Sequence, residues 1–456
     1  MQPAAGALAT KGRTRVAASG LREDFDMTLS PWAFLLVGVA WLVLRAPGLL
    51  VAPRFWAEES AFVSAATRLD GLAPLGFVYW RAGYASWPAN LGAWLGVTLL
   101  PLEWAPLATT LLALLIQLAP FAAVLFLRFD FPVSRSQRRI AAVALLTATT
   151  SSQGIAWLNT ISAQMHLGLL AAVLLFASAR QANRRASGAL VLALLLAGLG
   201  GPYALFLLPV FAGVAWAERD GWRVRQTLAL ALAFAVQLAI VLYKRFGLAL
   251  VNEKRGLGTL SPEAIELGLR ESVALPLFGQ RAVIGAPPFA DLLLGLSLAA
   301  VALAACVLVE AARAGEARTT GAALVRRLAR VELRGFFAWL CCVGAIAFTA
   351  FDGVPAGRYA VVPGGLTLMI VMLAAQRARP GIPRRLLAGV VGVAIATGVW
   401  NPRQPEALEC DGNSSGWQAA ARGRLRDTVV RLPVCPPGWT VKIHPDRTVE
   451  GSRAEP

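Results

Sequence analysis

Long apolar segments separated by short polar ones make up most of the chain. Segments of about 17–25 mostly apolar residues predict transmembrane helices, and nine segments fit, near residues 30–50, 105–127, 138–157, 163–179, 226–246, 290–311, 335–351, 361–376 and 386–400. The apolar stretch 187–217 is too long for one span, and Gly200, Gly201 and Pro202 divide it into helices at 187–200 and 203–217. The pattern therefore predicts an all-α polytopic membrane protein with about eleven transmembrane helices.

One further apolar stretch, 87–100, admits two interpretations. Counted as a span, it would invert every later loop and place the basic cluster at 135–139 outside the membrane. It is short, however, and Pro88 and Pro101 bracket it. Tryptophan is enriched at the membrane–water interface, and this region contains Trp80, Trp87, Trp94 and Trp104. We therefore predict a helix that lies along the interface rather than a span.

The composition is also that of a membrane protein. Hydrophobic residues make up 57% of the chain and charged residues 15%, with a mean hydropathy of +0.60. Soluble domains are typically about 45–50% apolar and about 25% charged. These values exclude a soluble globular enzyme and a disordered protein. The net charge of +17 would suit a nucleic-acid binder only if that charge faced nucleic acid.

The positive charge is distributed unevenly between two sets of loops. With the N-terminus in the cytoplasm, nearly all of the excess falls on six cytoplasmic segments, which are 1–29, 128–139, 180–185, 218–225, 312–334 and 377–385. The outer segments 51–104, 247–289, 352–360 and 401–456 are together neutral. Because lysine and arginine accumulate on the cytoplasmic side of membrane proteins, the pattern predicts this orientation and explains the basic charge without nucleic acid.

The two ends of the chain bear on its location. The first apolar run is longer than the core of a signal peptide and no clear cleavage site follows it, so we expect it to be retained. We expect 1–29 to be a cytoplasmic tail, 30–400 the transmembrane domain, and 401–456 a small extracytoplasmic C-terminal tail. In that tail, Cys410 and Cys435 either pair, as an oxidising compartment would allow, or remain free thiols. The Arg-rich, Lys-poor composition indicates a bacterium, and hence a bacterial inner membrane.

Ionisable groups are scarce in the middle of the spans and gather in the outer loops, chiefly in 51–104. Transporters of ions and polar solutes usually carry such groups in mid-membrane, so this pattern favours a site at the outer surface. Glu58 and Glu59 follow Trp56 soon after the first span. A carboxylate near a low-dielectric boundary, beside a like charge, has a raised pKa and suits a general base. The alternative is an acidic start to an interfacial helix, stabilised by the helix dipole.

The run from Pro53 to Glu59, preceded by Arg45-Ala46-Pro47, resembles the first outer loop of the GT-C superfamily of polytopic glycosyltransferases. That superfamily carries an acidic pair soon after the first span, followed by helices that lie along the membrane. Its bacterial members often read Glu-Asp-Gly here, so Glu59-Ser60 departs from the pattern while keeping a second carboxylate. The resemblance covers the first loop and the general layout of spans. It implies that Glu58 and Glu59 are catalytic and leaves open which of them is the base.

The resemblance also implies a polyprenyl-phosphate-linked sugar donor at the outer face, whose phosphate needs cations. Arg358, beside Tyr359 in a short outer loop, is the first candidate; the alternative is that it pairs with Asp352 or with lipid phosphate. Lys244-Arg245 and Lys254-Arg255 break the positive-inside bias locally, which donor binding would explain. Otherwise they belong to a solvated loop that is neutral overall.

Substrate binding is expected from aromatic and polar residues of the outer loops, namely Tyr359, Trp56, Arg81, Tyr84, Asn159, Gln164 and His166. The last three lie in a short outer turn, which alternatively satisfies helix ends as caps do. No spacing is diagnostic of a metal site, so no metal is assigned. A divalent cation such as Mg²⁺ or Mn²⁺ would take oxygen ligands, which Glu58, Glu59 and Asp70 offer.

The sequence thus predicts an inverting glycosyltransferase that transfers a sugar from a polyprenyl-phosphate-linked donor to an envelope glycan, lipid or protein acceptor. A polymerase or ligase of lipid-linked saccharides would share the donor and the compartment, but a large late outer loop would dominate it. A transporter or flippase of lipid-linked saccharides would show polar groups through the spans and related halves. We find neither of these features in the sequence.

Overall fold

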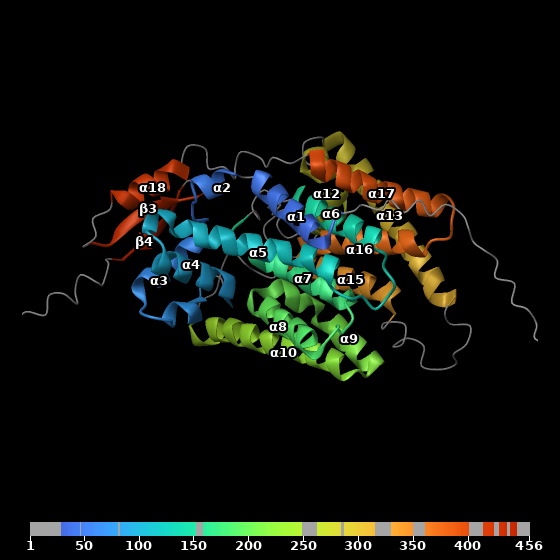
Figure 1. Ribbon diagram of the computed structural model, residues 1–456, viewed down its shortest axis with the longest axis horizontal. Helices are drawn as coiled ribbons and strands as arrows, with labels where there is room; N and C mark the ends of the chain where they lie inside the picture. The colour runs from blue at the N-terminus through green and yellow to red at the C-terminus, as the bar shows by residue number, and fades with distance from the viewer. Residues whose placement is uncertain are drawn as a thin grey trace, which may run out of the picture.

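A computed structural model describes residues 29–45, 47–80, 83–151, 158–248, 262–283, 287–314, 330–349, 361–400, 414–423, 428–435 and 438–444. Helices dominate the fold (Figure 1). The α-helices are α1 (Pro31–Arg45), α2 (Gly48–Val51), α3 (Glu59–Arg68), α4 (Trp87–Leu99), α5 (Ala105–Phe126), α6 (Arg135–Ser151), α7 (Ala163–Phe176), α8 (Arg184–Leu199), α9 (Leu208–Glu218), α10 (Gly221–Leu242), α11 (Pro262–Leu269), α12 (Leu275–Val283), α13 (Pro287–Ala314), α15 (Val331–Thr349), α16 (Val361–Arg377), α17 (Ile382–Trp400) and α18 (Ser414–Arg422).

Shorter elements connect these helices. Three are 3₁₀-helices, η1 (Ala73–Gly76), η2 (Leu102–Trp104) and η3 (Pro202–Leu207), and two are π-helical turns, η4 (Tyr243–Gly247) and η5 (Arg270–Ala274). The strands form two antiparallel hairpins, β1 (Val78–Tyr79) with β2 (Tyr84–Ala85) and β3 (Val430–Val434) with β4 (Trp439–Ile443).

A helix is present at each of the eleven segments that the apolar pattern selected. Within the described residues, four helices are long and apolar enough to cross a membrane: Leu102–Phe126, Gly221–Gly247, Phe289–Ala312 and Ile382–Trp400. The bent pair of α8 with η3 and α9 adds a fifth if it is counted as one span. Shorter apolar helices lie at Pro31–Arg45, Ala163–Phe176, Leu333–Gly344 and Val361–Arg377. The fold is that of an α-helical membrane protein.

The long apolar stretch divides where its glycines and proline predicted. α8 ends at Leu199, and the chain then bends by 118° into η3 and α9. Gly201 has φ = 154°, and a Cβ at this position would overlap the side chain of Gln164, so only glycine lets the two segments approach. Pro202 then begins η3, because its fixed φ suits the first turn of a helix.

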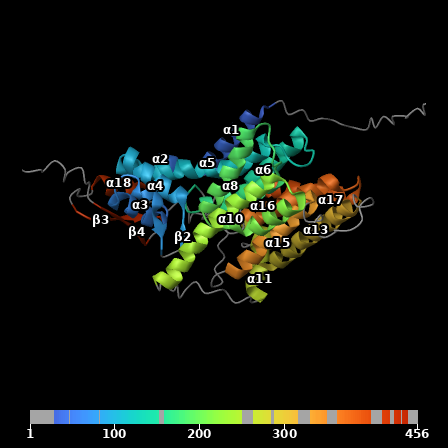
Figure 2. The same cartoon turned by 90° about the horizontal axis from the view of Figure 1, so that it is seen from below.

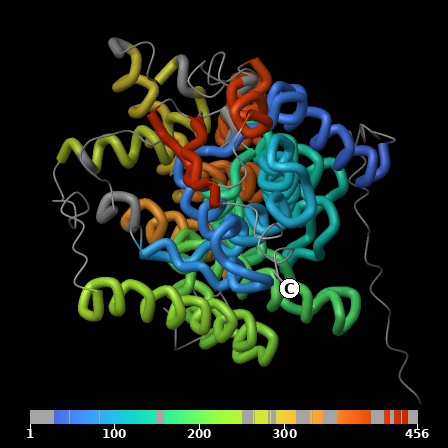
Figure 3. The backbone as a smooth tube through the Cα atoms, turned by 90° about the vertical axis from the view of Figure 1, so that its left-hand side faces the viewer, coloured from blue at the N-terminus to red at the C-terminus, as the bar shows by residue number. Residues whose placement is uncertain are grey.

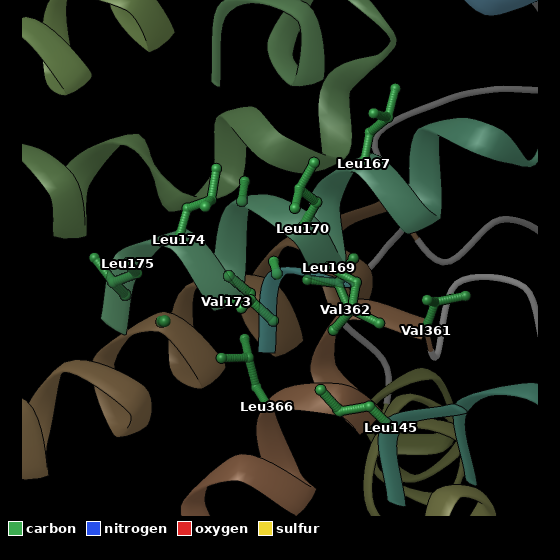
Figure 4. Close-up of a cluster of buried hydrophobic side chains, with 14 of the residues drawn as sticks. Leu145, Leu167, Leu169, Leu170, Val173, Leu174, Leu175, Val361, Val362 and Leu366 are labelled. Atoms are coloured by element: carbon green, nitrogen blue, oxygen red, sulfur yellow. The ribbon is translucent and has the colours of Figure 1, made fainter. Parts of the chain in front are cut away.

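Helix α7 lies at the centre of the bundle. All 14 of its residues are buried, and a helix that is apolar all round is typical of a core position. Figure 4 shows Leu170 and Val173 of α7 with Val362 and Leu366 of α16 in the main hydrophobic cluster. Because protein surrounds α7, its length of about 21 Å does not have to match the full thickness of a bilayer. The same burial makes α7 a rigid element, and the residues at its start are held on it.

The polar segments gather at the two ends of α5 and α7. One end holds ion pairs among Asp130, Glu218, Arg223 and Arg334, and we call it the arginine end. The other end holds α3, α4, the β1–β2 hairpin, α18 and the β3–β4 hairpin, on the left in Figures 1 and 2. We call it the acid-turn end, after the turn Trp56–Glu59 that it contains.

Helix α4 begins and ends at the acid-turn end. The ring of Trp417 in α18 meets Phe55, which precedes α4, edge-to-face at 5.0 Å. The indole Nε1 of the same tryptophan donates a hydrogen bond to the carbonyl of Leu102, which follows α4, at 3.2 Å. The side-chain amide of Asn90, near the start of α4, donates to the carbonyls of Leu75 at 3.0 Å and Phe77 at 2.9 Å in the first loop, so both ends of α4 lie at the acid-turn end. These contacts favour the interfacial interpretation of 87–100 over a span.

A second hydrophobic core lies at the acid-turn end, separate from the main cluster. Phe55, Phe62, Trp417, Val441 and Ile443 are among its buried members. The segment 401–456 is the predicted C-terminal tail. Its described parts, α18 and the β3–β4 hairpin, pack onto the first loop, as the view onto this end shows (Figure 3).

Candidate acid site

The acid turn joins an extended segment to α3, and Glu59 closes it. Glu59 is the first residue of α3 and is only 2% exposed. Its Oε2 accepts a hydrogen bond from the backbone N–H of Trp56, three residues earlier, at 2.8 Å. A carboxylate that reaches back in this way satisfies a donor at the helix start, as in a capping box, and its charge suits the positive end of the helix dipole. For Glu59, the geometry is that of an acidic helix start.

The second oxygen of Glu59 reaches a distant part of the chain. Its Oε1 accepts hydrogen bonds from the backbone N–H of Thr160 at 2.8 Å and from the Thr160 hydroxyl at 2.6 Å. Thr160 lies 101 residues further on, in the turn that leads into α7. The carboxylate therefore connects the first loop to the central helix. Hydrogen bonds to an ionised acceptor are among the stronger ones in proteins.

The surroundings of Glu59 change its proton affinity. Burial raises the pKa of this carboxyl above its ordinary value, because a charged carboxylate is poorly solvated there. The hydrogen bonds from Thr160 and Trp56 and the charge of Arg54 act in the opposite direction without cancelling the effect of burial. Glu59 therefore keeps its proton to a higher pH than an exposed glutamate does.

Glu58 occupies a different environment from its neighbour. It stands at the N-cap position of α3 in helical conformation, and its side chain does not cap the helix. It is half-buried, whereas Glu59 is enclosed. The Oε2 of Glu58 is enclosed as well, so the partial exposure of this side chain leaves at most Oε1 to a substrate hydroxyl. The two acids, which are adjacent in the sequence, therefore differ in burial and in their hydrogen bonds.

Arg54 belongs to this site, although the sequence analysis did not select it as a cation. It is 7% exposed, and its guanidinium lies over the Trp56 ring, 5.3 Å from the ring centroid. Burial lowers the pKa of Arg54 to about 10, while the charge of Glu59 acts to raise it. The guanidinium consequently stays protonated at neutral pH. Its signal in the sequence is its position directly before Phe55 and Trp56, whose rings shield it from water.

Lys244 reaches the first loop from the far end of α10. A Cβ on Gly83, in the β1–β2 hairpin, would lie 2.9 Å from Cδ and 3.3 Å from Nζ of Lys244. Lys244 is buried, whereas Arg245 is exposed and lies over the ring of Phe246 at 5.9 Å. The structure therefore separates the two cations that the sequence paired and places Lys244 against the loop that carries the acids.

The β1–β2 hairpin, which carries Tyr84, is tied to α10. The side chain of Gln237 accepts a hydrogen bond from the N–H of Ala85 at 3.2 Å and donates one to its carbonyl at 3.0 Å. The rings of Trp80 and Tyr243 meet at 5.2 Å. These contacts bring Tyr84 and Lys244 to the same corner of the acid-turn end.

The turn before α7 carries the remaining described candidates. Asn159, Gln164 and His166 are all buried. The Oδ1 of Asn159 accepts the N–H of Ser162 at 2.8 Å, which is the helix-end role that the sequence left as an alternative. Gln164 packs against Gly201. The residue of this turn that touches the acid is Thr160, which sequence reasoning passed over; a hydroxyl in a polar outer turn was its only signal.

Five candidates lie outside the described residues: Arg81, Lys254, Arg255, Arg358 and Tyr359. Trp56, which is described, contributes its backbone N–H to Glu59 and its ring to Arg54. Across the described ranges, no three His, Cys, Asp or Glu side chains are grouped so that they could hold a metal ion.

The site consists of an enclosed glutamate with three neutral donors, a more open glutamate beside it and the buried Arg54, while the buried Lys244 lies against Gly83 of the β1–β2 hairpin at the same end. Comparisons of the whole chain with protein-family models, with curated proteins and with solved structures find no match in any of the three.

Proposed function

We propose that this protein is a membrane glycosyltransferase that moves a sugar from a polyprenyl-phosphate-linked donor to an envelope glycan, lipid or protein acceptor. The observation that carries the proposal is the acid turn, in which Glu59 is enclosed and bound by three donors while Glu58 remains approachable at the start of α3. In this arrangement Glu59 is the rigid support and Glu58 is the proton acceptor.

In the proposed reaction, Glu58 is the general base and Glu59 positions it. Glu58 accepts the proton of an acceptor hydroxyl while that oxygen forms a bond to the anomeric carbon of the donor sugar. The bond from this carbon to the phosphate oxygen breaks, and the leaving polyprenyl phosphate keeps the electron pair. A single displacement of this kind inverts the anomeric configuration. Lys244 and Arg54 are the described cations available to the phosphate, and charge stabilisation of this type is a large part of catalysis.

We also propose that the acid-turn end faces outward and that the chain crosses the membrane eleven times. Three ion pairs at the arginine end join segments that the charge bias assigned to the cytoplasm: Asp130 with Arg223, Glu218 with Arg334, and Arg180 with Asp220. The first loop and the C-terminal hairpin share the other end, which requires an even number of crossings between them. Ten predicted spans meet that requirement, with a cytoplasmic N-terminus and an extracytoplasmic C-terminus.

The main rival functions are a transporter or flippase, or a polymerase or ligase, of lipid-linked saccharides. In the long helix Gly221–Gly247, the buried ionisable side chains Arg223 and Lys244 lie near the two ends. Asp291 and Glu310 of α13 are mostly exposed and also lie toward its ends. This distribution suits a site at the membrane surface better than a polar pathway through the bilayer.

The proposal is tested with purified protein in lipid nanodiscs and radiolabelled polyprenyl-phosphate hexoses and pentoses as donors, with release of polyprenyl phosphate as the readout. We expect Glu58→Gln to lower kcat by about 10²–10⁴-fold, the usual contribution of a general base. Glu59→Gln should lower kcat less and also destabilise the fold. Glu103→Gln, in the same loop, is the matched control and should leave kcat unchanged. Full activity in both Glu58→Gln and Glu59→Gln would show that the acid turn is not the catalytic site.

A further inference from the structure

The acid turn is bonded on its outer side to the C-terminal segment. The N–H of Ala57 donates to the carbonyl of Cys435 at 2.5 Å, and the N–H of Cys435 donates to the carbonyl of Phe55 at 3.1 Å. These two bonds form a short parallel β-bridge between Trp56 and Cys435. The peptide groups on both sides of Trp56 are therefore fixed by a single residue from the other end of the chain.

Cys435 is itself anchored. It is 2% exposed and disulfide-bonded. Of the two alternatives for the tail cysteines, a free thiol is therefore excluded for Cys435. The other described cysteines, Cys306, Cys341 and Cys342, are free. The expected partner, Cys410, lies outside the described residues. The geometry of a disulfide limits the positions that Cys435 can take relative to the cysteine bonded to it.

Other contacts hold the C-terminal unit at places away from the acids. Trp417 bonds to the carbonyl of Leu102, and the N–H of His444 donates to the hydroxyl of Thr67, near the end of α3, at 3.3 Å. These contacts would keep the unit docked if the bridge at Trp56 were lost. The bridge is the contact directed at the acid turn itself.

We propose that Cys435 is a positioning residue for the acid turn: its disulfide keeps its peptide group bonded to Phe55 and Ala57, so that Trp56 presents its N–H to Glu59 and Glu58 keeps its place. This inference rests on the proposed function and adds the C-terminal hairpin to the site. If the bridge opens, Trp56 is no longer held in line with Glu59, and water gains access to the carboxylate. Misplacement of a catalytic group by about 1 Å can lower a rate by about 10²-fold.

Opening the bridge also has a consequence for pH dependence. Burial is the largest cause of the raised pKa of Glu59, so access of water lowers that pKa toward its ordinary value. The acidic limb of a plot of kcat against pH reports protonation of the site, in which Glu59 takes part. The limb should therefore move to lower pH when the bridge is lost. A change that only reduces the amount of folded protein leaves the position of the limb unchanged.

The test compares Cys435→Ser with Thr67→Ala, which removes the second attachment of the same hairpin and serves as the matched control. For Cys435→Ser we expect kcat to fall by about 10–100-fold, KM for the donor to stay within about twofold of the wild-type value, and the acidic limb to move to lower pH. Thr67→Ala should retain the wild-type limb. In hydrogen–deuterium exchange without substrate, the Ala57 amide should exchange faster in Cys435→Ser, whereas the amides of α7 should not change.

Reduction of the folded wild-type protein by dithiothreitol, which converts the disulfide to two thiols, keeps the test decisive if Cys435→Ser does not fold. We expect the Ala57 amide to lose protection on reduction. Unchanged protection at Ala57, or an unchanged acidic limb in Cys435→Ser, overturns the proposal. The exchange measurement uses no substrate, so it decides the role of Cys435 even if the Glu58→Gln and Glu59→Gln assays reject the glycosyltransferase function.

Discussion

The two ends of the molecule surround their buried or half-buried carboxylates with different partners. At the arginine end, Asp130 and Glu218 each pair with both Arg223 and Arg334. At the acid-turn end, Glu59 is held by the neutral donors of Trp56 and Thr160. Two arginines balance two acids in the first case, whereas desolvation outweighs the favourable contacts in the second and raises the pKa. The first arrangement suits a structural clamp, and the second suits a carboxyl group that is held in place beside the more open Glu58.

The clamp at the arginine end has little freedom. Arg223 also donates to the carbonyl of Ala177 and to the side chain of Gln226, both at 3.1 Å. Its side chain is 1% exposed, so water cannot replace these partners. The network joins the α5–α6 loop, the α9–α10 turn and the start of α15. Its role is to fix the ends of these helices relative to one another.

The largest effect is expected from breaking this clamp. Arg223→Ala leaves Asp130 and Glu218 with one cation between them, and removing one partner of a buried pair typically costs about 3–5 kcal/mol of unfolding free energy. The measurement is denaturant-induced unfolding in detergent micelles. Arg180→Ala is the matched control at the same end, because the Arg180 side chain is 74% exposed and pairs with Asp220 at 3.3 Å. An exposed pair contributes under about 1 kcal/mol. Equal losses in the two variants would contradict the description of the network as a buried clamp.

An intermediate effect is expected at the acid-turn end. Thr160→Val keeps the shape and the backbone N–H but removes the hydroxyl that donates to Glu59. A hydrogen bond to a charged acceptor contributes about 1.5–3 kcal/mol, against about 0.5–1.5 kcal/mol for a neutral acceptor. Thr227→Val, which removes a hydroxyl that donates to the backbone carbonyl of Arg223, provides the neutral comparison. Thr160→Val should therefore lower the unfolding free energy more than Thr227→Val does. A larger loss in Thr227→Val would mean that Glu59 is not the stronger acceptor.

Glu59 should also give the stability a pH dependence whose direction follows from its raised pKa. Because the folded protein raises the pKa of Glu59 above 4.5, it binds this proton more tightly than the unfolded chain does. The resulting stabilisation is fully present below the unfolded pKa and is lost as pH rises through the folded pKa. The unfolding free energy of the wild type, relative to Glu59→Gln, should therefore fall from about pH 4.5 upward and then level off. Urea titrations at a series of pH values measure it; a relative rise over this window would mean that the folded pKa is depressed.

Much of the architecture follows from local properties of the sequence. Length and hydropathy located the helices because each apolar segment must be buried in lipid or protein, whichever neighbours it has. The glycine and proline residues at 200–202 located the break between α8 and η3 for a similar reason, since the conformational limits of these residue types are intrinsic. The bracketing prolines of 87–100 likewise indicated the extent of α4.

The site depended instead on contacts between distant segments. The partner of Glu59 lies 101 residues away, and no periodicity relates the two positions. Only the net charge of each loop was used to predict the orientation. In that net charge the acids Asp130 and Glu218 are cancelled by arginines, so their ion pairs were not predicted. The C-terminal hairpin did have a local signal. Leu432 and Val434 alternate with polar or exposed positions, as do Val441 and Ile443, and this period of two is typical of a half-buried strand.

The docking of the C-terminal hairpin has a consequence for biosynthesis. Thr67 emerges from the ribosome well before its partner His444, which lies 377 residues further along the chain. At about 5–20 residues per second, that interval is roughly 20–75 seconds. During this time Phe55 lacks the ring of Trp417 and Trp56 lacks its bridge to Cys435, whereas the rings that Phe62 meets, Phe77 and Tyr79, belong to the first loop itself. A nascent chain, or one truncated before the hairpin, would thus reach the membrane with an acid turn that lacks its two backbone bonds to Cys435.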